Sequence, residues 1–101
     1  MAIMQNKLSS PGFYVLDEPE ATLSPQRQLS LLIEIKNAVD SGAQFLIASH
    51  SPILLGYPGA DIISFDNGQI HSITYEETES YQVTEMFINS REYFLRRLLD
   101  R

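Results

Sequence analysis

The sequence has no cysteine, few basic residues and no long apolar run. Without cysteine, disulfide bonds and thiolate metal sites are excluded. Only 7 residues are basic against 13 acidic ones, and the net charge of −6 argues against a nucleic-acid surface along the whole chain. No window approaches the roughly 18 apolar residues of a membrane helix, and residues 1–11 lack the apolar core of a signal peptide. We therefore expect a cytoplasmic protein without a membrane segment.

What is present is typical of one small globular domain. The 101 residues are 44% hydrophobic, which makes wholesale disorder improbable and is enough for a single core. Residues 1–12 are a polar lead-in, which ends in a serine, proline and glycine cluster typical of turns. The folded part is therefore expected over residues 13–101.

Two apolar runs and the helix between them form the clearest pattern. Residues 13–16 and 45–48 are apolar without alternation, as expected for strands of a parallel sheet that are covered on both faces. Ser24 and Pro25 are typical of a helix start, and apolar positions recur at helical spacing up to Gly42, which is placed as a C-terminal cap. Strand, helix and strand in this order predict a right-handed βαβ unit with parallel strands.

The rest of the chain predicts a hairpin and two helices. Residues 62–65 and 70–75 flank Asp66-Asn67-Gly68, and Asn-Gly favours a hairpin turn. A helical tail is expected from about Thr78, with a break near Asn89 and Ser90 before a last helix over residues 91–99. The fold class is therefore α/β. Because one βαβ unit and a hairpin form an unusual complete domain, we expect that the front of a larger fold is missing.

Polar side chains follow both predicted strands. Asp17 and Glu18 come directly after the first strand, and His50 follows the second. Parallel strands end at the same edge of a sheet, where α/β proteins bind ligands. Asp17 could hold Mg²⁺ directly or through water, Glu18 could deprotonate a water molecule, and His50 could donate to a phosphate oxygen. The residues alone leave two plainer interpretations open: the carboxylates begin a solvated loop, and His50 caps a short helix near residues 51–52.

Two segments together resemble a known family. Leu16-Asp17-Glu18-Pro19-Glu20-Ala21-Thr22-Leu23-Ser24-Pro25 resembles the Walker B and D-loop segment of ABC-type ATPases, in the soluble branch of predicted ATPases related to AAA and SMC-like proteins. Ala48-Ser49-His50-Ser51-Pro52 resembles the switch, or H-loop, of the same branch. The resemblance is clear over residues 13–75 and weaker over the tail at 76–101. It implies that residues 13–101 are the C-terminal half of a P-loop NTPase domain.

The resemblance also implies roles, with ATP and Mg²⁺ as cofactors of the complete domain. Asp17 would support Mg²⁺, Glu18 would be the general base, and His50 would contact the γ-phosphate. The D-loop residues would face a partner subunit across the nucleotide: Ala21, Thr22, Leu23 and Ser24. Ser24 departs from the transporter pattern, which has an aspartate there, so coupling between subunits of the transporter kind is not implied.

The phosphate-binding loop that such a site needs does not occur. No Gly-x-x-x-x-Gly-Lys-Ser/Thr is found in the 101 residues, so we expect the isolated chain neither to bind ATP tightly nor to hydrolyse it. Three hypotheses follow: half of an ATPase whose other half is encoded upstream, a non-catalytic interaction module, and a split enzyme completed in trans by a P-loop-bearing chain or a second ATPase subunit. An unpaired sheet edge also predicts self-association. Arginines at 91, 96, 97 and 101 leave a local nucleic-acid contact possible.

Overall fold

The structure is a computed structural model, and it describes residues 12–65 and 68–100. Two compact units divide the chain, Met1–Pro58 and Gly59–Arg101. The candidate residues at positions 17, 18 and 50 all lie in the first unit.

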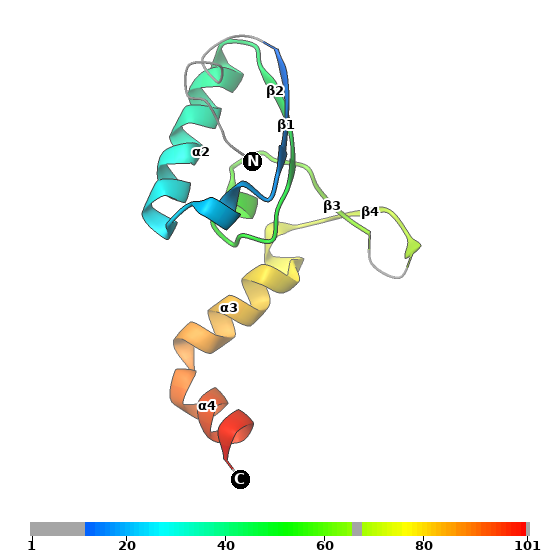
Figure 1. Cartoon of the computed structure of the whole chain (residues 1–101). Helices are drawn as coiled ribbons and strands as arrows, with labels where there is room; N and C mark the ends of the chain where they lie inside the picture. The colour runs from blue at the N-terminus through cyan, green and yellow to red at the C-terminus, as the bar shows by residue number, and fades with distance from the viewer. Residues whose placement is uncertain (1–11, 66–67, 101) are drawn as a thin grey trace. The chain divides into compact units, whose positions relative to one another are not determined.

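The first unit is built on a parallel βαβ arrangement, as predicted. Strand β1 (Phe13–Asp17) pairs in parallel with β2 (Gln44–Ala48), and helix α2 (Pro25–Asp40) connects them (Figure 1). The register places Phe13 opposite Gln44 at one end and Asp17 opposite Ala48 at the other. Both strands therefore end at the same edge, and the loops that follow them meet there. This confirms the α/β fold class and is consistent with part of a P-loop NTPase fold.

Helix α2 begins and ends where the sequence predicts, because both ends are capped locally. The Ser24 side chain accepts a hydrogen bond from the Arg27 backbone N–H at 3.2 Å, and Pro25 occupies the first helical position. At the other end Gly42 has φ of 100°, and its N–H donates to the carbonyl of Val39 at 2.9 Å. A second bond, from the N–H of residue 43 to the carbonyl of residue 38, completes a Schellman motif.

The core of this unit lies between the sheet and α2. Leu16 of β1 and Leu31 and Ile35 of α2 are buried, and Tyr14 and Phe45 stack with ring centroids 5.1 Å apart on the same side of the sheet. Leu54 in the short 3-10 helix η2 (Leu54–Gly56) joins the same cluster.

The opposite face of the sheet differs from the prediction. Both strands were expected to be covered on both faces, yet Phe13, Val15 and Leu46 are 63%, 54% and 59% exposed. Successive side chains of a strand point to opposite faces, and only one face of β1 and β2 packs against α2. The two apolar runs lack alternation because the outer face of the sheet is also apolar, and the described residues leave that face exposed.

The second unit contains a β-hairpin and two helices. Strands β3 (Ile62–Ser64) and β4 (His71–Ile73) pair antiparallel, which confirms the hairpin, although both are shorter than predicted. In the predicted hairpin turn, Asp66 and Asn67 lie outside the described residues, and Gly68 has φ of 71°.

The helical tail of this unit follows the predicted pattern. A 3-10 helix, η4 (Tyr75–Glu77), precedes α3 (Glu79–Asn89) and α4 (Arg91–Leu99), so the break falls at Ser90 as expected. Ser90 does not cap α4 through its side chain. Within residues 12–65 and 68–100, no helix has the length and apolar character needed to cross a membrane.

Candidate functional site

The strand β1 ends in an unusual backbone conformation. The N–H of Glu18 still donates to the carbonyl of Ala48 at 2.7 Å, and this bond extends the β1–β2 pairing by one residue. Glu18 itself has φ of 46° and ψ of 56°, and no other non-glycine residue in the described part of the chain has a positive φ. A left-handed conformation costs an L-residue roughly 1–2 kcal/mol. Such strain collects at functional sites, where the surrounding structure maintains it.

The turn after Glu18 brings a second carboxylate to the same edge. Pro19 is fully buried and begins the 3-10 helix η1 (Pro19–Thr22), which directs Glu20 towards the loop after β2. The Ser49 hydroxyl donates to Glu20 Oε1 at 2.9 Å, and the backbone N–H of His50 donates to Glu20 Oε2 at 2.9 Å. One carboxylate therefore ties the two loops together.

A buried serine fixes the loop that follows β2. The N–H of Ser51 donates to the Ser49 hydroxyl at 2.9 Å, and the Ser51 hydroxyl donates to the Gln28 side chain of α2. The Ser51 oxygen also accepts from the N–H groups of Ile53 and Leu54, each at 3.1 Å. Ser51 and Gln28 are both buried, so this network holds the loop against the helix.

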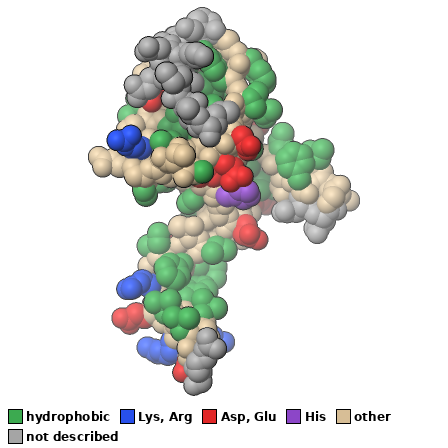
Figure 2. Space-filling view, viewed as in Figure 1, with side chains coloured by type: hydrophobic (Ala, Val, Ile, Leu, Met, Phe, Trp, Pro, Cys, Tyr) green, Lys and Arg blue, Asp and Glu red, His purple; other side chains and the backbone are tan. Residues whose placement is uncertain are grey.

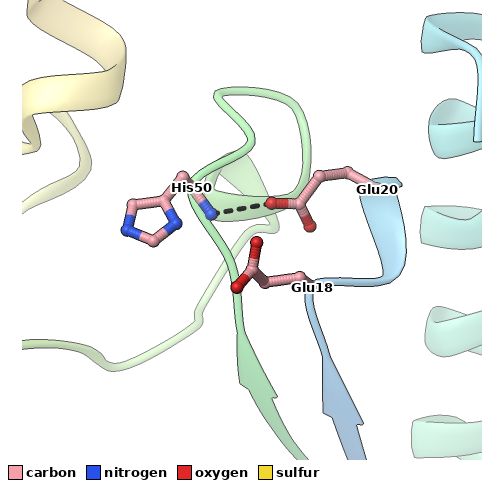
Figure 3. A group of neighbouring side chains, drawn as sticks. All are labelled: Glu18, Glu20 and His50. Atoms are coloured by element: carbon pink, nitrogen blue, oxygen red, sulfur yellow. Dashed lines mark hydrogen bonds between the residues drawn. The ribbon is translucent and has the colours of Figure 1, made fainter. Parts of the chain in front are cut away.

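These contacts gather three ionisable side chains. One ligand atom each from Glu18, Glu20 and His50 lies within 4.8 Å of the others (Figure 3). Glu18 and His50 are exposed, and Glu20 is half-buried. Two carboxylates and an imidazole at the edge of a parallel sheet can accept a proton from water, donate to an anionic oxygen or contribute to a cation site.

The electrostatics of Glu20 favour its charged form. Partial burial by itself would raise the pKa of Glu20. The hydrogen bonds from the His50 backbone, from its own backbone and from the Ser49 hydroxyl, together with the nearby His50 ring, outweigh this and lower the pKa below its ordinary value. Glu20 is therefore an anion at neutral pH and can keep accepting from the Ser49 hydroxyl and the His50 backbone N–H.

A hollow of about 350 Å³ lies beside this group and opens to solvent. Its lining comes from the loops after β1 and β2 and from the start of α2: Glu20, Pro25, Gln28, His50, Ser51, Pro52 and Ile53. On the surface, acidic side chains lie next to a histidine (Figure 2). The hollow is thus an accessible space with charged and hydrogen-bonding groups on its walls.

The predicted set of positions 17, 18 and 50 is only partly brought together. Asp17 ends β1 opposite Ala48, at the same edge as the other two. By the alternation of β1, however, its side chain lies on the outer face with Phe13 and Val15, and it is not part of the close group. Glu18 does not continue the strand, because its left-handed conformation ends β1 at Asp17.

The D-loop residues separate into two kinds. Ala21 and Thr22 lie in η1 with exposed side chains. Leu23 is half-buried and packs against the core cluster, and Ser24 caps α2 with its hydroxyl. The first two are therefore available to a partner, whereas the last two also have structural roles within this chain.

The sequence alone does not indicate Glu20 as a site residue, although Glu20 lies within the motif at residues 16–25. Its role depends on the 3-10 turn that begins at Pro19 and on the loop at Ser49 and His50, which is far away in the sequence. A proline immediately before a glutamate was the only local signal, because proline favours a tight turn there.

Comparison with known proteins gives one family. Residues 2–56 match the family described as AAA domain, putative AbiEii toxin, Type IV TA system. The matched segment contains β1, α2, β2 and all three residues of the close group. No curated protein and no solved structure matches the chain.

Proposed function

We propose that the chain, which belongs to this AAA domain family, supplies one side of the active site of a P-loop ATPase. The observation that carries the proposal is the group of Glu18, Glu20 and His50 at the edge where β1 and β2 both end. This edge is where α/β proteins bind ligands, and an ATPase needs a base and a phosphate contact there. The finer assignment to the ABC-type branch depends on the two sequence motifs at residues 16–25 and 48–52.

Each of the three residues has a distinct part in this proposal. Glu18 is the general base that takes a proton from the attacking water, and its exposure and strained backbone support that part. His50 contacts the γ-phosphate as a donor. Glu20 is a positioning residue, because its carboxylate already holds the His50 backbone and the Ser49 hydroxyl.

A magnesium ion fits the residues at this edge. Mg²⁺ prefers oxygen ligands, keeps several waters and is bound in such sites through one or two carboxylates and the phosphates. Asp17 would hold it, directly or through water, because it lies at the edge where β1 and β2 both end. The bound ion would neutralise charge that develops on the phosphate oxygens. Glu20 is less suited to bind the ion because its two oxygens already accept hydrogen bonds.

A P-loop must complete the site. Phosphoryl transfer depends on positioning and on charge stabilisation by the loop amides and its lysine, and no such loop occurs in the 101 residues. The P-loop would come from a preceding segment of a longer protein or from a separate chain. The exposed apolar face of β1 and β2 supports this, because parallel sheets are covered by helices on both faces and a P-loop segment would bring such a helix. Ala21 and Thr22 would then face a partner subunit.

Complementation tests the proposal. The chain alone should release no phosphate from ATP and should show no low-micromolar ATP binding by calorimetry. Mixed with, or fused to, a P-loop-bearing segment of the same family, it should restore Mg²⁺-dependent phosphate release. Low-micromolar binding by the chain alone, or no release with any such segment, would contradict the proposal, and the second result would favour a non-catalytic interaction module.

A further inference from the structure

One buried glutamine near the start of α2 contacts both loops of the candidate site. The side-chain nitrogen of Gln28 donates to the carbonyl of Leu23, which ends the turn after β1, at 3.1 Å. Its side-chain oxygen accepts from the hydroxyl of Ser51, the buried residue that follows His50. Buried polar groups are tolerated when they are paired, and both groups of this amide are paired. Gln28 therefore connects the turn after β1 with the loop after β2.

The hydrogen bonds of Ser51 determine which way this amide is turned. The Ser51 oxygen accepts from the backbone N–H groups of Ile53 and Leu54, which occupies both of its lone pairs. Its hydroxyl is then left to donate, and an amide can accept only through its oxygen. The nitrogen of Gln28 is consequently directed at the carbonyl of Leu23. A replacement must offer one acceptor and one donor in the same places to keep both contacts.

This glutamine and Glu20 together close a ring of hydrogen bonds. Glu20 accepts from the Ser49 hydroxyl, which in turn accepts from the N–H of Ser51. From Ser51 the ring continues through Gln28 to the carbonyl of Leu23. The N–H of Leu23 donates to the carbonyl of Glu20 at 3.1 Å and completes it. The turn after β1 is thus tied to the loop after β2 at two points.

We propose that Gln28 is a positioning residue of the ATPase site, which keeps His50 in place relative to the turn after β1. The inference rests on the proposed function, in which His50 contacts the γ-phosphate. Glu20 holds the backbone of His50 (Figure 3), and Gln28 holds the next residue, Ser51. With one of these ties removed, the loop can pivot about the other. A misplacement of about 1 Å can lower the rate of an enzyme about 10²-fold.

Hydrogen exchange in the chain alone tests whether Gln28 holds the loop. Gln28→Met keeps the length of the side chain but removes both of its hydrogen bonds. His50 is exposed, so its amide proton exchanges through local opening of the loop. In the variant, nuclear magnetic resonance should show about tenfold faster exchange at His50 and Ser51, because the opening no longer breaks these bonds. If Gln28 only stabilises the fold, Ile35 inside α2 exchanges faster, whereas His50 and Ser51 keep their rates.

Turnover of the complemented enzyme tests the functional part. Gln28→Met should lower the turnover rate about ten- to hundredfold and leave ATP binding nearly unchanged. Gln26→Met is the matched control, because it makes the same exchange at an exposed position of the same helix and should alter neither turnover nor hydrogen exchange. If circular dichroism shows that Gln28→Met does not fold, Gln28→Glu replaces it. An ionised carboxylate can still accept from Ser51 but cannot donate to Leu23, so the same changes are expected.

Two results would overturn the proposal. One is unchanged exchange of the His50 amide in the chain with the folded Gln28 variant. The other is full turnover of the same variant under conditions in which the wild-type enzyme is active. An inactive wild-type mixture would instead contradict the proposed ATPase, and the exchange rates would then still decide whether Gln28 holds the loop.

Discussion

At the scale of single residues, the site depends on the carboxylate of Glu20, to which the sequence motifs assign no role. Glu20 accepts hydrogen bonds from the Ser49 hydroxyl and from the His50 backbone, and so connects the turn after β1 to the loop after β2. His50 is thereby held next to Glu18 even though they lie on different loops. Removing the Glu20 charge should loosen this connection without changing either of the two groups that would act on the substrate.

The pH dependence of this connection can be measured. The pKa of Glu20 is lowered, so its contribution to stability is present above the pKa of an unfolded glutamate and is lost as pH falls through the lower folded value. In an isotopically labelled chain, the amide-proton shift of His50 should titrate with a midpoint below the ordinary pKa of a glutamate. Glu20→Gln should remove this step, whereas Glu34→Gln on α2 should leave it. A midpoint above the ordinary value would contradict the assignment.

The sequence indicated the residues at the strand ends but not the shape of the turn. Asp17, Glu18 and His50 were found because a parallel βαβ pattern predicts which residues reach the same edge. The left-handed conformation of Glu18 and the inward turn at Pro19 depend on contacts with Ala48 and with the loop after β2. Such contacts are distant in sequence, so local preference does not reveal them. This is why Asp17 was placed in the close group and Glu20 was not.

At the scale of elements, the helices were predicted well because their ends are determined locally. The Ser24 cap and the glycine at position 42 fix α2, and the break at Ser90 separates α3 from α4. The strands were located correctly, but their exposure was not. Whether a strand is covered on both faces depends on what packs against it, and α2 covers only the inner face of β1 and β2.

The end of α2 gives a stability prediction. Gly42 has φ of 100° and no atom within 4 Å of the position of an added Cβ, so Gly42→Ala introduces backbone strain without a steric clash. We expect a loss of about 1–2 kcal/mol in the free energy of unfolding, because an L-residue pays that amount for a left-handed conformation. Urea denaturation measures it. Ser41→Ala, at an ordinary φ of −94°, is the control and should change stability far less; equal losses would contradict the account.

At the scale of the whole molecule, two surfaces of different kinds stand out. The outer face of β1 and β2 is apolar and adjoins the site, which suits the P-loop segment that the proposed ATPase requires. The other surface lies on α3 and α4, where large hydrophobic side chains such as Val83, Ile88 and Leu98 are exposed. The family match covers residues 2–56 and therefore bears on the first surface only.

In the proposed enzyme, Glu18 acts on water at the common end of β1 and β2. Phosphate release by the complemented enzyme tests it most directly, with ATP binding measured in parallel. Glu18→Gln should lower the turnover rate by about 10²–10⁴-fold, the usual contribution of a general base, and leave ATP binding nearly unchanged, while Glu34→Gln keeps full turnover. Undiminished turnover in the Glu18→Gln enzyme would contradict the claim.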